Sequence, residues 1–259
     1  MRAIDLSVDD WLQIQGGSWV RRSDATYSQP SFLTGVTFEN GLEYPFAQVL
    51  DLSRIFVSAY PGGPRSQDNG RWIDRYELVN VFATATDEEG WEWFMIGPNQ
   101  WVEQRFLAVY EKIEKPEDVS GRWVAVDLYE QTLIAYEDET PVFATLISSG
   151  LPTHETNQGL FNVWASMPSD GMSGAAGAPS AYALQSVPWV MYFDGGISLH
   201  GTYWHDLFGY RQSHGCVNLS ISDAKWLFYF LHDGDLETEN NNAVYVYSSG
   251  TYGVTATGI

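Results

Sequence analysis

The residues best suited to covalent chemistry in this sequence lie between positions 200 and 218. The run SHGCVN at 213–218 contains the only cysteine among the 259 residues, and a His-Gly pair at 200–201 precedes that cysteine by 16 positions. A single cysteine cannot form an internal disulfide bond. Either packing or chemistry must therefore explain the thiol.

The neighbours of Cys216 favour chemistry over packing. Polar residues precede it from Arg211 to His214, and Gly215 adjoins it, whereas a structural thiol usually lies among apolar neighbours. Nearby positive charge and hydrogen-bond donors lower the pKa of a thiol, and glycine lets a substrate carbonyl approach the backbone. The pattern predicts a cysteine nucleophile whose proton passes to His200, with backbone amides of the cysteine turn facing the developing oxyanion.

Two questions remain open at the level of these residues. A histidine base needs a partner that fixes its tautomer; no acid stands at an obvious position, although Asp206 is nearby, and a backbone carbonyl could serve instead. Metal binding is the second question, because His200, His205, His214 and Cys216 are all ligand types. Their spacings match no closed structural zinc site and only one is a thiolate, so we expect no metal and no cofactor.

Composition excludes several classes of protein. The chain is 44% hydrophobic and 18% charged, which argues against disorder, and its 11 Trp, 15 Tyr and 24 Gly favour strands and turns. The net charge of −20, with Lys only at positions 112, 115 and 225, would repel nucleic acids and anionic lipid surfaces. The sequence contains no run of 18 apolar residues and therefore predicts no transmembrane helix. The first residues contain no apolar signal-peptide core. Taken literally, these features indicate a cytoplasmic protein.

An internal repeat weakens that interpretation. Residues 11–20 and 93–102 both show Trp-x-x-Ile, a turn containing glycine, and then Trp-Val, which predicts two hairpins. Strand-like runs at 54–60 and 76–85 precede the second copy, whereas almost nothing precedes the first. We therefore expect that the chain begins partway through a repeat unit, as though an N-terminal portion, with a signal sequence, were missing.

The sequence divides into two principal regions around a charged, proline-containing linker at 112–120. Residues 44–111 resemble a bacterial SH3-like barrel, because they end in a tryptophan-bearing hairpin and the phrase QWVEQRFL at 100–107. Any small antiparallel barrel with aromatic core positions is the alternative. We expect a partial SH3-like repeat or extension at 1–43, a catalytic domain at 121–248 and a tail at 249–259.

The second region reads as β-structure with one helix. Short apolar runs separated by polar turns predict strands at 123–128, 132–136, 142–147, 187–193, 197–200 and 243–248. We expect the last of these strands to close the sheet. Residues 166–183 are rich in Gly, Ala, Ser and Pro and predict a long mobile loop. Ser220 and Asp223 have the spacing of a capping box and predict a helix that continues to Leu231.

These motifs carry a resemblance to a known family. Residues 121–248 resemble the catalytic domain of the L,D-transpeptidases, the YkuD-type domain, in the order of His200-Gly201-Thr202 and the SHGCVN run. The Gly150-Leu-Pro turn and the segment 156–161 are also similar to the family pattern, with Asn157 where proline is common. The resemblance covers about half of the chain. It implies a mainly β fold, with a β-sandwich and one short helix after the cysteine, preceded by the small SH3-like barrel or barrels.

The resemblance also implies roles for individual residues. Cys216 would attack the carbonyl of the third residue of a peptidoglycan stem peptide, release the terminal D-Ala, and pass the acyl group to an amine of a neighbouring stem as a 3→3 crosslink. His200 would be the base, with the carbonyl of Gly201 orienting its ring. The oxyanion donors would be Gly215, Cys216 and Tyr182, and the residues shaping the substrate site would be Trp204, Ser213, His214 and Asn218. Ordinary aromatic packing is the alternative for Tyr182 and Trp204.

Two further functions stay open beside the transfer reaction. Water could replace the acceptor amine, which would make the protein an L,D-carboxypeptidase or endopeptidase on the same stem peptides. The catalytic domain could instead be inactive, with the SH3-like segment acting as a wall-binding module. Since family members are exported, we expect an extracytoplasmic location despite the missing signal peptide. The expected partners are peptidoglycan stem peptides and the cell wall, and no nucleic acid.

Overall fold

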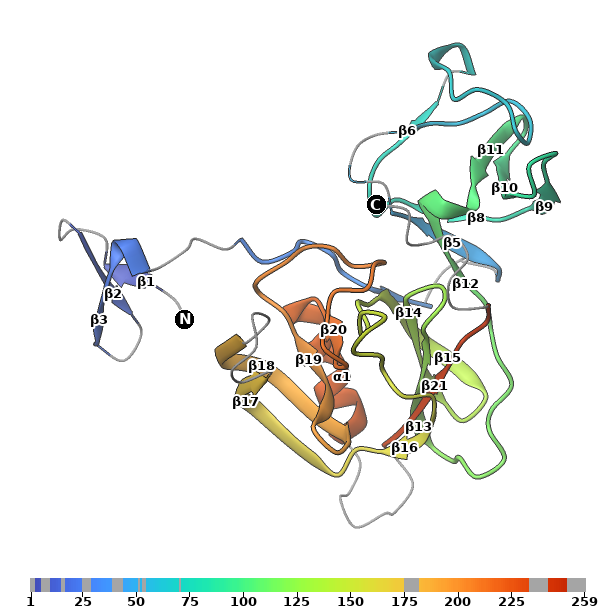
Figure 1. The fold of residues 1–259 in the computed structure, drawn as a ribbon. Coiled ribbons are helices and arrows are strands. Elements are labelled where there is room, and N and C mark those ends of the chain that lie inside the picture. The colour runs from blue at the N-terminus through green and yellow to red at the C-terminus, as the bar shows by residue number, and fades with distance from the viewer. Residues whose placement is uncertain are drawn as a thin grey trace.

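The computed structural model describes residues 3–5, 10–14, 17–24, 29–38, 44–50, 52, 55–69, 71–174, 182–232 and 242–250. Within these ranges the protein is mainly β, with one α-helix, as expected (Figure 1). No helix among these residues is long and apolar enough to cross a membrane.

A six-stranded sheet forms the centre of the C-terminal half. Its order is β16-β21-β13-β14-β15-β4, and the bounds are β4 Val36–Thr37, β13 Arg122–Asp127, β14 Thr132–Glu137, β15 Thr140–Leu146, β16 Gly159–Asn162 and β21 Ala243–Tyr247. Strand β21 runs parallel to β13 and lies inside the sheet, between β16 and β13. The expectation that this last strand closes the sheet is wrong, because β16 pairs with its outer edge.

A four-stranded sheet, β17-β18-β19-β20, packs against the first with the helix α1. Its bounds are β17 Ala165–Gly174, β18 Tyr182–Asp194, β19 Ile197–Gly201, β20 Val217–Leu219 and α1 Ile221–His232. Buried residues from both sheets and the helix share one core, among them Val124, Met191, Leu199 and Leu227. This sandwich with a short helix after the cysteine is the expected fold.

The loop expected at 166–183 is largely strand. Met167, Asp170 and Ser173 pair across an antiparallel ladder with Val190, Val187 and Ala183 of β18. Residues 175–181 lie outside the described part of the chain. Small and polar residues had suggested a loop, but an antiparallel pair of strands needs few apolar side chains where its faces are only partly buried.

The helix begins where its sequence predicts. The Ser220 hydroxyl accepts a hydrogen bond from the Asp223 amide at 3.2 Å, which satisfies one of the free N–H groups of the first turn. The Asp223 carboxylate in turn accepts from the Gly35 amide at 3.0 Å and from the Thr145 hydroxyl at 2.6 Å. Asp223 therefore also ties the N-terminal segment to the six-stranded sheet, where Val36 pairs with Ala144.

Residues 46–110 form a separate group of short antiparallel strands, which we call the N-terminal unit. Their bounds are β5 Phe46–Val49, β6 Ile55–Phe56, β7 Trp72–Ile73, β8 Leu78–Asn80, β9 Ala83–Thr86, β10 Glu92–Gly97, β11 Gln100–Glu103 and β12 Leu107–Tyr110. They make the sheets β12-β5-β8, β11-β10-β9 and β6-β7 around a core of their own.

The N-terminal unit also covers the outer face of the six-stranded sheet. Alternate residues of β13 point to opposite sides: Val124 and Val126 enter the sandwich core, while Trp123 enters a second core with Phe46 and Tyr110 of the unit. Burial on both faces explains why the sequence of β13 is a continuous apolar run instead of an alternating one. Residues on either side of the 112–120 linker therefore share one core, which joins the two halves of the chain.

The two repeat copies form matching hairpins. Strands β2 Trp11–Ile14 and β3 Trp19–Arg21 pair Leu12 with Val20, as β10 and β11 pair Phe94 with Val102. Each hairpin carries a third strand on the same side, β1 Ala3–Asp5 in the first and β9 in the second. The predicted hairpin repeat is confirmed.

Candidate active site

The histidine lies in β19, and the cysteine directly precedes β20, the parallel strand beside it. The register places Leu199 opposite Val217 and His200 opposite Asn218, which leaves Ser198 opposite Cys216. Leu199 and Val217 face the sandwich core, so Ser198 and His200 lie on the other face by alternation. His200 follows Ser198 by two residues, about 7 Å along the strand. The sheet thus presents the thiol and the imidazole on one face.

The thiol is partly buried and neutral. The Ser198 hydroxyl lies 3.7 Å from Cys216 Sγ as a donor, and the Gly196 carbonyl lies 3.9 Å from Sγ as an acceptor of the thiol proton. Burial raises the pKa of the thiol above its ordinary value, although the hydroxyl and amide of Ser198 counteract part of that rise. Polar neighbours in the sequence had suggested the opposite direction, but desolvation outweighs them here.

The His200 ring is held in one tautomer. Its Nδ1 lies 3.2 Å from the Gly201 carbonyl oxygen, and because a carbonyl only accepts, Nδ1 carries the proton. His200 is only 2% exposed, and this burial lowers its pKa to about 4. The hydrogen bond to Gly201 opposes that shift. The ring is therefore neutral at pH 7, and Nε2 is left as a base. Among the described residues no hydrogen bond joins this ring to Cys216.

A polar network shapes the turn before the cysteine. Gly215 adopts φ +117°, a left-handed conformation that glycine tolerates, and its carbonyl accepts a 2.7 Å hydrogen bond from Thr156. Thr156 accepts in turn from the Gly150 amide at 3.0 Å. The Ser213 hydroxyl accepts from the Gly215 amide at 3.1 Å and donates to the Cys216 carbonyl. The amide of Gly215, expected as an oxyanion donor, is thus bonded to Ser213 in this structure.

Asn218 contacts His205 instead of the thiol. His205 Nδ1 accepts from the Leu207 amide at 3.2 Å, and burial lowers the pKa of His205 to about 4, so the neutral ring carries its proton on Nε2. The terminal amide of Asn218 lies 2.9 Å from that Nε2. The Asn218 oxygen must therefore face His205 as the acceptor. This orientation also gives a partner to an oxygen that is otherwise buried without one among the described residues.

The remaining candidates are placed as follows. Trp204 packs against His200, with 5.7 Å between ring centroids, and His214 is exposed with its ring 4.6 Å from that of His154. Tyr182 is the first residue of β18, opposite Gly174, and its side chain lies outside what the structure describes. Within the described residues, no three His, Cys, Asp or Glu side chains gather to hold a metal ion, so the four ligand candidates do not form one site.

Asp206, weighed as a partner for the histidine, points elsewhere. Its carboxylate lies 3.1 Å from the Arg75 guanidinium and 3.1 Å from the Tyr76 hydroxyl, both in the N-terminal unit. The Gly201 carbonyl takes the orienting position instead.

Two site residues were missed as contributors by the sequence analysis. Ser198 contacts the sulfur, and Thr156, noted only as part of a family segment, holds the cysteine turn through the Gly215 carbonyl. Strand alternation could have identified Ser198, because it precedes His200 by two residues on the same face. The contact of Thr156 joins segments 59 residues apart, which no local pattern reveals.

Comparison with known proteins identifies the C-terminal half. Residues 121–249 match the family profile of the YkuD domain, the L,D-transpeptidase catalytic domain. Residues 121–249 belong to the L,D-transpeptidase (YkuD) domain family. The expected resemblance is thereby confirmed for the transpeptidase domain, and members of this family are cysteine-dependent enzymes. The match does not include residues 44–111, so the expected SH3-like barrel stays a prediction.

Solved structures of L,D-transpeptidases are similar to this chain. A cysteine-to-serine variant from Enterococcus faecium is 27% identical with a TM-score of 0.43, covering 54% of this chain and 55% of that chain. The catalytic domain from E. faecium, acylated by ertapenem, is 27% identical with a TM-score of 0.40, over 50% and 98%. An L,D-transpeptidase from Mycobacterium smegmatis is 17% identical with a TM-score of 0.44, over 86% and 100%.

The matched region spans 55% of the length of the full E. faecium variant. A search of curated proteins found no match.

Proposed function

We propose that this protein is a peptidoglycan L,D-transpeptidase that acts outside the cytoplasm through a Cys216 thioester. The observation that carries the proposal is the placement of a neutral, tautomer-fixed His200 and the thiol on the same face of neighbouring segments, β19 and the residue before β20. A base whose pKa lies near 4 is unprotonated at neutral pH and ready to accept a proton.

The first half-reaction would form the acyl-enzyme. Rotation of the Cys216 side chain away from the Gly196 carbonyl would bring the thiol proton to His200 Nε2. The sulfur would then attack the carbonyl carbon of the third stem residue, and the peptide bond to the terminal D-Ala would break. His200 would return the proton to the departing amine, so that the leaving group is neutral.

The second half-reaction would regenerate the thiol. An amine on a neighbouring stem would attack the thioester carbon, lose its proton to His200, and expel the sulfur, which takes that proton back. The Gly201 carbonyl would hold the imidazolium through both halves, since Nδ1 keeps its proton throughout. The result is a new amide, the 3→3 crosslink.

The oxyanion would be stabilised by backbone amides of the cysteine turn. We assign this role first to the Cys216 amide, since a preorganised backbone donor contributes about 3 kcal/mol. The Gly215 amide would join it after release from the Ser213 hydroxyl. Tyr182 is retained as a third donor in the proposal. The stem-peptide site would be shaped by Ser213, which holds the cysteine turn, and by Trp204, His214 and Asn218 around that turn.

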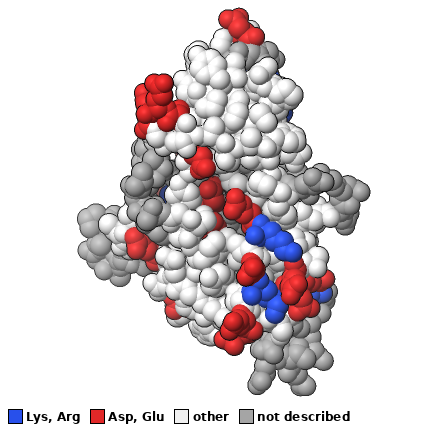
Figure 2. All heavy atoms as spheres, turned by 90° about the vertical axis from the view of Figure 1, so that its right-hand side faces the viewer, with Lys and Arg blue, Asp and Glu red and all other residues white. Residues whose placement is uncertain are grey.

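The charge of the protein fits a cationic group on the substrate. The chain has 33 acidic and 13 basic residues, and Figure 2 shows acidic side chains spread along one face while the basic ones gather in one band. A diamino acid at the third stem position would carry such a charge. We propose the N-terminal unit, as an SH3-like barrel within residues 44–111, as the part that contacts the wall.

The nucleophile can be tested with ertapenem and intact-mass spectrometry. We expect one adduct per chain in the wild type and none in Cys216→Ala, because only a thiol at this position can form the thioester. His200→Gln should slow acylation at least a hundredfold by removing the base. Uptake of the drug by Cys216→Ala at the same stoichiometry would contradict the assignment.

The same site could hydrolyse stem peptides. The carboxypeptidase alternative shares the acyl-enzyme and differs only in using water as the acceptor. Incubation with a disaccharide-tetrapeptide separates the two: transfer yields a crosslinked dimer, and hydrolysis yields the tripeptide.

A further inference from the structure

The loop between the two sequence motifs is joined to the N-terminal unit. This loop, residues 202–213, carries Trp204 and His205 and leads from His200 to the cysteine turn. Phe208 is fully buried in the core shared with Phe46 and Leu50 of the unit, and the Tyr210 hydroxyl donates to the Leu50 carbonyl at 3.1 Å. A Cβ on Gly209 would lie 2.2 Å from Leu50 Cδ2, so the loop backbone is in close contact with the unit at this point.

The first half of the loop is held by a polar contact. Arg75 donates two hydrogen bonds to Asp206. Its Nη1 lies 3.1 Å from the carboxylate, and its Nη2 contacts the backbone carbonyl. The Tyr76 hydroxyl contacts the same carboxylate at 3.1 Å, and the Arg75 guanidinium stacks 4.2 Å from the Tyr76 ring. Two hydrogen bonds to one residue, together with stacking on an aromatic ring, hold a guanidinium in one orientation.

Contacts continue from Asp206 to the reacting residues. The adjacent His205 bonds the amide of Asn218, which lies opposite His200 in the strand register. Trp204, two residues before Asp206, packs on the His200 ring. Because Arg75 and Tyr76 reach His200 through these packed neighbours, displacement of Asp206 would loosen the cover over the base.

Resting on the function proposed above, we propose that Arg75 and Tyr76 are positioning residues of the active site, which hold Asp206 and thereby the 202–213 loop against His200. The N-terminal unit is then a structural part of the catalytic centre in addition to any contact with the wall.

Two variants of the full chain test this role. Arg75→Met removes the ion pair, and Tyr76→Phe removes only one hydroxyl and therefore preserves folding. Arg71→Met is the matched control, because the partners of Arg71 in the described part of the chain, Glu77 and Gln100, belong to the same unit and not to the loop. Arg75→Lys keeps the charge but loses the planar fork, and should restore part of the Arg75→Met defect.

We expect Arg75→Met to slow acylation of Cys216 by ertapenem about tenfold, Tyr76→Phe about threefold, and Arg71→Met not at all. Hydrogen exchange of peptides covering 202–213 should rise in the first two variants. The midpoint of the acid limb of the pH–rate profile should move upward from about pH 4, because water that reaches His200 would reduce the desolvation that lowers its pKa. The titratable neighbour of His200 is His205. General destabilisation would leave that limb in place.

Different experimental results would overturn this proposal and the proposed function. If the wild type is acylated and Arg75→Met and Tyr76→Phe match Arg71→Met in rate, acid limb and loop exchange, the positioning role is overturned. If the wild type takes up no ertapenem, the transpeptidase proposal fails, while loop exchange still reports whether Arg75 holds the loop.

Discussion

At the scale of single residues, the site combines a protonated thiol with an unprotonated base. Burial pushes the pKa of Cys216 up and that of His200 down, so both changes oppose a resting thiolate–imidazolium pair. Charge would develop only as the proton moves during attack. Such an arrangement protects the single thiol from adventitious oxidation, because the thiolate is the reactive form.

This arrangement predicts the pH dependence of acylation. His200 must be neutral to accept the proton, so the rate of ertapenem adduct formation should fall as the pH drops through about 4 and stay level from pH 5 to 7. The measurement is the single-turnover acylation rate between pH 3.5 and 8. An acid limb centred near 6.5 would indicate instead that His200 is exposed to water.

At the scale of elements, the six-stranded sheet is extended at one edge by a strand from the N-terminal part of the chain. Strand β4 extends the edge of β15, and the carboxylate of Asp223 binds the Gly35 amide beside it. A Cβ at Gly35 would lie 2.3 Å from Phe143 Cζ and 2.6 Å from the Ala144 carbonyl oxygen. The backbone therefore approaches the sheet as closely as only glycine allows.

Gly35→Ala should accordingly destabilise the protein by about 2 kcal/mol, a typical effect of overpacking a filled site. Urea unfolding followed by tryptophan fluorescence measures this change. Gly171→Ala is the control, since its Cβ would meet only the Leu184 carbonyl at 3.9 Å. Equal midpoints for the two variants would show that β4 is not held against the sheet.

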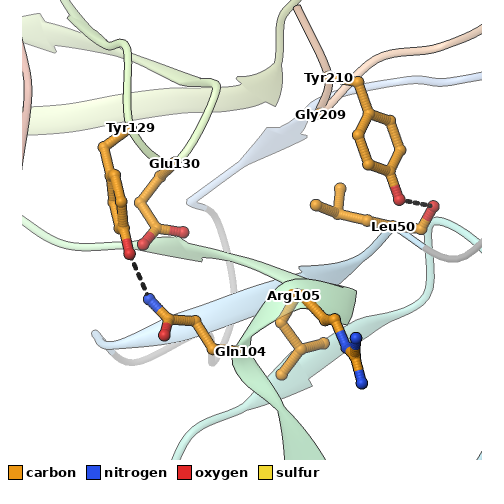
Figure 3. A pocket seen from close by; sticks show the side chains of 8 residues that line it. Leu50, Gln104, Arg105, Tyr129, Glu130, Gly209 and Tyr210 are labelled. Carbon is orange, nitrogen blue, oxygen red and sulfur yellow. Dashed lines mark hydrogen bonds between the residues drawn. The ribbon is translucent and has the colours of Figure 1, made fainter. Parts of the chain in front are cut away.

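At the scale of the whole molecule, the two halves meet over a small pocket that contains a carboxyl group. Figure 3 shows Glu130 beside the Tyr129–Gln104 hydrogen bond, with the Tyr210–Leu50 bond on the opposite side. The Glu130 Oε2 accepts from the Val109 amide of the N-terminal unit at 2.7 Å. Desolvation at this interface raises the pKa of Glu130 to about 8.

The raised pKa makes this interface sensitive to pH. Between about 4.5 and 8 the folded protein binds a proton at Glu130 that the unfolded chain releases, so this group's contribution to stability falls as pH rises through that window. Glu130→Gln keeps an acceptor without the charge, and its Tm should exceed that of the wild type by more at pH 8 than at pH 5. Glu88→Gln, at an exposed position, is the control. A difference in Tm that does not grow with pH would contradict the prediction.

Much of this architecture follows from local sequence. Alternation and apolar runs predicted β13, β14, β15, β18 and β19, and the Ser220–Asp223 spacing predicted the start of α1, because these signals depend on neighbours within a few residues. The two sequence motifs likewise indicated Cys216 and His200 as candidates for nucleophile and base, and the family resemblance implied the orienting role of the Gly201 carbonyl.

Other features were decided by the tertiary structure, since they depend on contacts between distant segments. Burial set the direction of the Cys216 and His200 pKa shifts, and its extent is known only once both sheets are packed. Pairing with β18 made residues 165–174 a strand despite their loop-like composition. The contact of Arg75 with Asp206 joins positions 131 apart in the chain, so no pattern in either segment could have predicted it.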